Sequence, residues 1–222
     1  MNSNVESQLE KILEEKTKPC SKSEWLEDIE ASKDSPYDYR FDHTRRVVKL
    51  AKKISREMKA NSEVITLAAW LHDIAKPGNH GIPNHGEKSA EMASAILNEM
   101  GYDEDIISRV RDVICKHVGL ILEKELEPLE AQILWEADKL DKLGIVGYVH
   151  GIIIFPRRQP GKTMDDLSKW LREFFPLADR IADSMHTPIG KQIAQERLKH
   201  LKEMSRMLEY ELTIHQGEDM DD

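Results

Sequence analysis

The sequence predicts an all-α protein, and three observations lead to this. Apolar residues recur at helical spacing in almost every segment. Strand signals are nearly absent, because the one β-branched run, "GIIIF" at residues 151–155, is short and ends at Pro156. Charged residues make up 33% of the chain and aromatic residues 6%, a balance typical of helices with charged outer faces. With 222 residues, we expect one domain with terminal extensions.

The predicted helices begin with an N-terminal extension over residues 1–35. "FDHTRRVVKLAKKI" then turns Val47, Leu50, Ala51 and Ile54 to one face, and "SEVITLAAWLHDIAK" turns Val64, Leu67, Ala68, Leu71, Ile74 and Ala75 inward. After a loop at 76–86, one helix ends at Gly101, and the next is capped by Asp103 and stopped by Gly119.

"LEAQILWEADKLDKLG" forms a further helix, residues 156–162 form a second loop, and the last long helix starts at Thr187 with Pro188 in its first turn. We expect the core at 36–150, C-terminal helices at 151–215 that complete the same domain, and a disordered acidic tail at 216–222.

Composition narrows the classes of partner. The net charge of −9 argues against a duplex nucleic acid, because phosphate contacts need clustered Lys and Arg. Cys20 and Cys115 are far apart in the chain, so neither a disulfide framework nor a thiolate metal site is indicated. No window approaches 18 apolar residues, so we expect no membrane partner and a cytoplasmic protein. The sequence leaves the oligomeric state open.

The stretch "WLHDIAK" places His72 and Asp73 beside an apolar stripe, where both would be largely buried. A buried carboxylate is costly unless a cation or hydrogen-bond donors compensate, and a metal ion would do so. The alternative is a His-Asp pair that closes a helix end, with the histidine bonded to a carbonyl. His43 and Asp138, on two other predicted helices, can converge with this pair. Imidazole and carboxylate without thiolate suit Mn, Fe, Co, Ni, Zn or Mg.

These residues resemble the HD superfamily of metal-dependent phosphohydrolases. "DHTRRV", "LAAWLHDIAK" and "ILWEADKLDKLG" match its local patterns in the same order, over about residues 36–150. "TPIGKQIAQERLKHL" also resembles the C-terminal helix of stand-alone bacterial members that act on nucleotides. The resemblance implies an all-α helical bundle, the HD domain, and a metal-binding site made by His43, His72, Asp73 and Asp138.

The resemblance also implies a second metal ion. His85 and His117 fall where binuclear members of the superfamily have extra ligands, so Asp73 would bridge two divalent ions. Taken alone, His85 is equally readable as a loop histidine and His117 as a helix-end histidine. His80 stays outside the predicted ligand set, and the four other histidines are expected at the surface or at helix caps, namely His150, His186, His200 and His215.

We therefore predict a phosphohydrolase that cleaves a phosphate ester or anhydride of a small substrate, a nucleotide being favoured, by attack of metal-activated hydroxide. The predicted catalytic residues are Asp73, Lys76 and Arg46, while Lys139, Asp141 and Lys142 are candidates for contact with substrate or ligands. Two alternatives remain, a binuclear iron oxygenase and a non-catalytic HD module that senses a nucleotide. The loop with Arg157 and Arg158 could contact phosphate or be an ordinary solvated turn.

Overall fold

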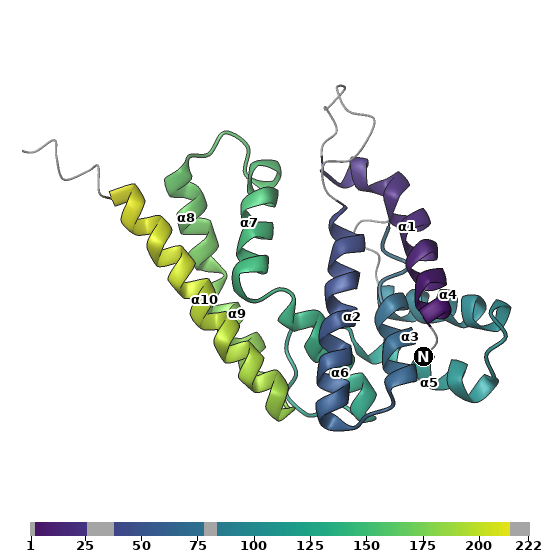
Figure 1. Cartoon of the computed structure of the whole chain (residues 1–222). Coiled ribbons are helices and arrows are strands. Elements are labelled where there is room, and N and C mark those ends of the chain that lie inside the picture. Colours follow the sequence, from purple (N-terminus) through teal and green to yellow (C-terminus); the bar gives the residue numbers. More distant parts are fainter. Residues whose placement is uncertain (1–2, 26–37, 78–83, 214–222) are drawn as a thin grey trace, which may run out of the picture. The chain divides into compact units, whose positions relative to one another are not determined.

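The computed structural model describes residues 3–25, 38–77 and 84–213, and helices joined by turns account for them (Figure 1). The helices are α1 (Ser3–Trp25), α2 (Tyr39–Met58), α3 (Ser62–Leu71), α4 (His85–Glu99), α5 (Glu104–Lys116), α6 (Leu129–Leu140), α7 (Gly144–Arg158), α8 (Met164–Glu173), α9 (Phe175–Asp183) and α10 (Pro188–Thr213). No strand occurs within those three ranges. The predicted all-α class is therefore confirmed.

The chain divides into two compact units. The first contains residues 1–120 and 124–138, and the second contains residues 121–123 and 139–222, so that α6 begins in the first unit and ends in the second. The predicted domain borders at residues 35, 150 and 215 stay predictions. The tail at 216–222, His80 and His215 lie outside the described residues.

The first unit is built on α2, α3, α4 and α5. α2 packs on α3, α4 packs on α5, α3 also packs on α5, and α1 lies against α2 and α3. The apolar side chains in the middle are buried, for example Val47 and Ile54 of α2, Leu67 of α3 and Val110 of α5. Each such side chain contributes about 1.5–3 kcal/mol by leaving water, so the core holds the helix ends in place.

Helix ends in this unit follow the expected capping rules. Asp103 is the N-cap of α5, where its Oδ1 accepts from the Ile106 backbone N–H at 2.9 Å. The predicted start of this helix is therefore confirmed. Asp38 caps α2 in the same way, with Oδ1 accepting from the Phe41 N–H at 3.1 Å.

The helix that carries the His-Asp pair is shorter than predicted. α3 ends at Leu71, and residues 72–75 form turns. The Ile74 N–H donates to the Leu71 carbonyl at 3.2 Å and the Lys76 N–H to the Asp73 carbonyl at 2.9 Å, both across three residues. These tighter hydrogen bonds end the α-helix and place His72 and Asp73 at its C-terminal end.

In the second unit, α10 packs along α7, α8 and α9 (Figure 1). Thr187 caps α10, since its Oγ1 accepts from the Gly190 N–H at 3.0 Å, as predicted. The predicted loop at 156–162 starts too early, because α7 continues to Arg158 with Pro156 inside it. A proline this near the helix end removes only one backbone donor, so the last turn still forms. None of the helices in the described parts is both long enough and apolar enough to cross a membrane.

Candidate metal centre

His43, His72 and Asp73 bring three ligand atoms together in the first unit. One ligand atom from each lies within 4.8 Å of the others, and all three residues are buried. Asp138 adjoins them, because its Oδ1 is 3.3 Å from Nε2 of His43. The start of α2, the end of α3 and the last turns of α6 therefore meet at one point. We call these four residues the first cluster.

Asp73, His85 and His117 form a second group whose ligand atoms also lie within 4.8 Å of one another. Nε2 of His117 is 3.3 Å from Oδ1 of Asp73, and Nε2 of His85 is 3.9 Å from the same oxygen. The His85 and His117 rings have centroids 5.2 Å apart. The first residue of α4 and the C-cap of α5 thus meet the end of α3. We call these three residues the second cluster.

The two carboxylate oxygens of Asp73 face different clusters. Oδ1 lies toward His85 and His117, whereas Oδ2 lies 3.6 Å from Nε2 of His72. Lys76 also contacts Oδ2, through its Nζ at 2.8 Å. A carboxylate in this position can bind one cation with each oxygen, which is the arrangement of a bridging ligand.

The buried histidines are oriented by backbone carbonyls. Nδ1–H of His72 donates to the Ala69 carbonyl at 2.8 Å, and Nδ1–H of His117 donates to the Ile114 carbonyl at 2.5 Å. Each Nε2 lone pair then points into the site, as in histidines that bind metals. Nε2 of His72 is buried and has no hydrogen-bond partner among the described residues. The carbonyl bond expected for a His-Asp pair that only closes a helix end is therefore present. It uses Nδ1 of His72, however, and leaves Nε2 available to bind a cation.

Burial and charge keep these groups in the states that metal ligands need. Burial lowers the pKa of His72 from 6.5 to about 3, which keeps the imidazole neutral. Burial opposes ionisation of Asp73, but the nearby His72 and Lys76 outweigh it and hold the pKa of this carboxyl well below its usual value. A neutral imidazole beside an ionised carboxylate fits a divalent cation.

Two supporting residues were missed by the sequence reasoning. Ser89 of α4 is buried, and its Oγ accepts from the Ala75 N–H at 3.3 Å, which fixes the turn after the His-Asp pair. Gly86 allows α4 to approach the end of α5, because an added Cβ would lie 3.3 Å from the Cys115 carbonyl oxygen and 2.5 Å from Cγ2 of Val118, just beyond that helix. A glycine directly after His85 was the available signal in the sequence.

The two clusters do not include the other predicted site residues. Arg46 of α2 forms an ion pair with Asp42 one turn earlier. Lys139, Asp141 and Lys142 belong to the second unit, where Lys139 and Asp141 are buried. Roles for these four residues stay predictions. Arg158 is exposed in the last turn of α7.

Comparison with known proteins identifies the part of the chain that carries the candidate ligands. The family model described as "HD domain" matches residues 40–143, a range that includes all six candidate ligands. The chain contains an HD domain. All six candidate ligands therefore lie within a known domain, and their roles as metal ligands stay predictions.

Relatives extend this likeness over most of the chain. "Uncharacterized protein YpgQ" from Bacillus subtilis (strain 168) is 26% identical over 191 residues, which is 85% of this chain and 90% of that protein. A crystal structure of B. subtilis YpgQ shares the fold with a TM-score of 0.67 and 22% identity over 93% of this chain and 94% of that chain.

A Bacillus thuringiensis protein described as an HD-superfamily hydrolase has a TM-score of 0.65 and 20% identity, covering 97% of this chain and 98% of that one. YpgQ has also been solved in complex with ADP, with a TM-score of 0.63 and 20% identity over 93% of this chain and 97% of that chain. These similarities show that the fold beyond the HD domain, as well as the domain itself, is shared with solved proteins.

Proposed function

We propose that this chain is a metal-dependent phosphohydrolase that cleaves a phosphate ester or anhydride of a nucleotide. The observation that carries the proposal is the position of Asp73, whose two oxygens each face a separate group of histidines. One carboxylate between two imidazole clusters suits a pair of divalent cations. Two cations of this kind lower the pKa of a water molecule and neutralise charge on a phosphoryl group during in-line displacement.

The protein's own groups prepare the site for this chemistry. His43, His72, Asp73 and Asp138 would hold one cation, and Asp73, His85 and His117 would hold the other. His72 is kept neutral by burial, so its Nε2 lone pair is available at neutral pH. The carbonyls of Ala69 and Ile114 fix two of the rings, which reduces the rearrangement needed on binding.

Lys76 is the residue we assign to the substrate. Its ammonium group contacts Asp73 Oδ2 at 2.8 Å, and about a quarter of its side chain is exposed. A cation at the edge of the ligand cluster can bind a phosphate oxygen and offset the negative charge that develops there. Arg46 is assigned to the same task, since its side chain is 22% exposed and lies one turn beyond His43.

The nucleotide class is supported by the relatives. YpgQ, which is similar to this chain over most of both lengths, forms a complex with ADP. We therefore propose that a nucleoside phosphate occupies the site of this chain and that its phosphate chain faces the metal ligands.

The experiment is metal analysis followed by an activity screen. Protein purified without added metal is analysed for its elements, stripped with EDTA, and reloaded with Mn, Mg, Fe, Co, Ni or Zn in turn. Release of phosphate and pyrophosphate is then measured with nucleoside mono-, di- and triphosphates. We expect metal-dependent release that EDTA abolishes.

His200→Ala serves as the matched control, because His200 is a partly exposed histidine of α10 in the second unit. It should keep both the metal and the rate. Protein that binds no divalent metal contradicts the proposal, and metal-loaded protein that consumes O2 but releases no phosphate favours the oxygenase.

A further inference from the structure

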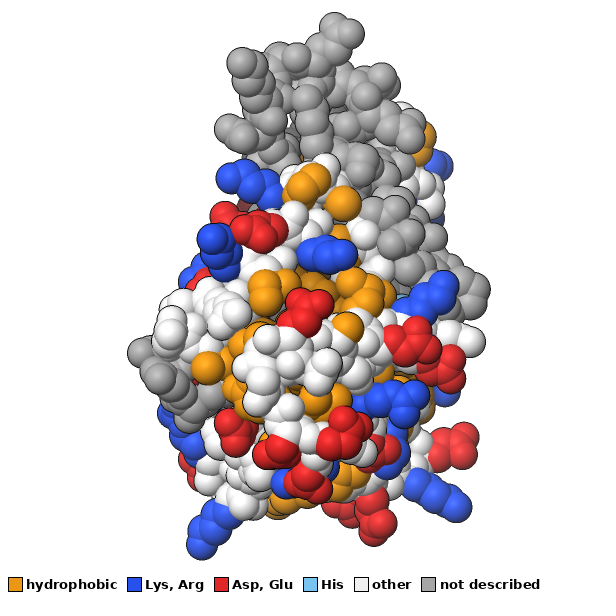
Figure 2. All heavy atoms as spheres, turned by 90° about the vertical axis from the view of Figure 1, so that its right-hand side faces the viewer, with side chains coloured by type: hydrophobic (Ala, Val, Ile, Leu, Met, Phe, Trp, Pro, Cys, Tyr) orange, Lys and Arg blue, Asp and Glu red, His pale blue; other side chains and the backbone are white. Residues whose placement is uncertain are grey.

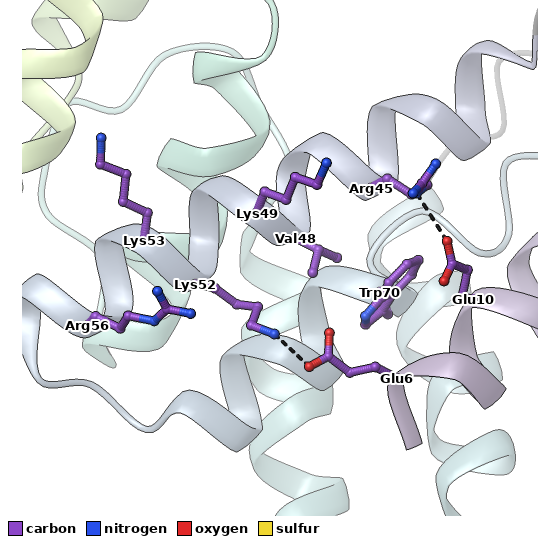
Figure 3. A pocket seen from close by; sticks show the side chains of 9 residues that line it. All are labelled: Glu6, Glu10, Arg45, Val48, Lys49, Lys52, Lys53, Arg56 and Trp70. Carbon is purple, nitrogen blue, oxygen red and sulfur yellow. Dashed lines mark hydrogen bonds and ion pairs between the residues drawn. The ribbon is translucent and has the colours of Figure 1, made fainter. Parts of the chain in front are cut away.

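A pocket separate from the metal centre lies in the first unit, on a different face of α2 from His43. It has a volume of about 430 Å³, within the range of about 300–1,000 Å³ usual for small-ligand sites. Its lining residues are Glu6 and Glu10 of α1, Arg45, Val48, Lys49, Lys52, Lys53 and Arg56 of α2, and Trp70 of α3 (Figure 3). None of these residues belongs to the two metal clusters.

The pocket concentrates positive charge in an acidic protein. Five cationic side chains of α2 line it against two carboxylates, although the whole chain carries a net charge of −9. Figure 2 shows the face on the right-hand side of Figure 1, where acidic and basic side chains are interspersed among apolar ones. A local excess of one sign in a hollow raises the local concentration of ions of opposite charge.

The carboxylates of α1 neutralise only part of this charge. Glu10 pairs with Arg45 at 3.1 Å, and Glu6 pairs with Lys52 at 2.6 Å, as the dashed lines in Figure 3 show. Both pairs attach α1 to α2. Lys49, Lys53 and Arg56 have no ion-pair partner among the described residues and are exposed. The pocket therefore has three positive charges in excess.

Trp70 adds an unused hydrogen-bond donor at the base of the pocket. The residue is 5% exposed, and its indole Nε1–H is buried without a hydrogen-bond partner in the described part of the chain. Figure 3 shows the ring between the two ion pairs, with its nitrogen on the side of Lys52 and Glu6. Buried donors are rarely left unpaired, so this N–H is an independent sign of a missing acceptor.

We propose that this pocket binds a chain of linked phosphate groups, with the Trp70 N–H and the α2 cations as donors. Arg45 and Arg56 are eleven positions apart, roughly 16 Å along the helix at 1.5 Å per residue, so the cations between them match several negative charges in a row better than one. Two sources share this chemistry, an inorganic polyphosphate and the phosphate chain of a nucleotide. The site is separate from the metal centre and does not depend on the proposed hydrolase activity.

The test is equilibrium binding of inorganic tripolyphosphate to the full chain in EDTA, measured by calorimetry and by tryptophan fluorescence. EDTA removes divalent metal, so the metal centre contributes little to binding. We expect about one tripolyphosphate per chain, with an affinity that falls as salt is added. The double variant Lys49→Gln/Lys53→Gln should bind about 10-fold more weakly. Trp70→Phe keeps the ring but loses the donor, and should bind about fivefold more weakly.

Lys191→Gln/Lys199→Gln is the control, because it removes the same charge from exposed positions of α10 in the second unit. Its affinity should stay within twofold of the parent, and circular dichroism should show that every variant is folded. Equal binding of ATP and tripolyphosphate would identify the phosphate chain as the recognised group, whereas tighter binding of ATP would show that the nucleoside also contributes. The proposal is wrong if the parent binds no tripolyphosphate, or if the pocket variants bind it as tightly as the control.

Discussion

The two clusters of the metal centre are supported very differently by the fold. In the first cluster, His43, His72 and Asp138 come from three helices and are at most 4% exposed. In the second, His117 is fully buried, but His85 is the first residue of α4 and its side chain is 22% exposed. The first cluster belongs to the core of the unit, whereas the second depends on the close approach of α4 to α5. We infer that a cation at the second cluster is the more easily lost.

Asp73 is the one residue common to both clusters, so its removal should have the largest effect. Asp73→Ala should abolish binding of both cations and lower activity by at least about 1,000-fold, since Asp73 alone among the described residues belongs to both clusters. Elemental analysis and the rate of phosphate release check this together. Normal metal content in the variant would contradict the bridging role.

His85→Ala and His117→Ala should each remove the cation of the second cluster alone. Each should halve the metal content, because the first cluster keeps all of its ligands. Activity should fall about 100-fold, since one of two charges near the phosphoryl group is lost. The matched comparison is His43→Ala, which we expect to empty the first cluster instead. Full metal content and an unchanged rate in both variants would show a mononuclear site.

Lys76→Ala should leave both clusters loaded and affect only the substrate. We expect a loss of about 10- to 100-fold in turnover of phosphate esters, roughly 1.4–2.8 kcal/mol, with metal content unchanged. The control is Lys88→Ala, an exposed lysine of α4. A loss of metal together with activity would show that Lys76 supports the ligands rather than the substrate.

The smallest effect concerns the stability of metal-free protein. Because burial holds the pKa of His72 at about 3, the unfolded chain, with a pKa near 6.5, takes up the proton first as the pH falls. The stability of the metal-free protein is therefore unaffected by His72 above pH 6.5. It decreases progressively as the pH falls from 6.5 to about 3, because the unfolded chain binds a proton at His72 that the folded chain does not. The free energy of unfolding should therefore fall by about 2 kcal/mol between pH 7 and pH 5.

Urea unfolding in EDTA at the two pH values measures this change. His72→Gln should show a smaller pH dependence than the parent, and His200→Gln should match the parent. Identical pH dependence in the parent and His72→Gln would contradict the prediction, because it would show that the pKa of His72 is not lowered in the folded, metal-free protein.

The amino-acid sequence by itself determined the helical class, several helix ends and the candidate ligands. The apolar spacing of α5 and the capping residues Asp103 and Thr187 are local signals, and helix formation within one segment depends on such signals. The position of Asp73 beside an apolar stripe also predicted a cation site, because burying a carboxylate without a cation is costly.

Only the tertiary structure showed how near the candidate ligands lie to one another. Asp73 and His117 are 44 residues apart in sequence, and their 3.3 Å contact depends on how α3 packs on α5. The need for a glycine at position 86 follows only from the packing of α4, since an added Cβ would lie too close to Val118. The basic pocket likewise needed α1 to place Glu6 and Glu10 beside α2, with Trp70 beneath them. Distances between segments follow from the packing of whole helix faces, which no single stretch of sequence specifies.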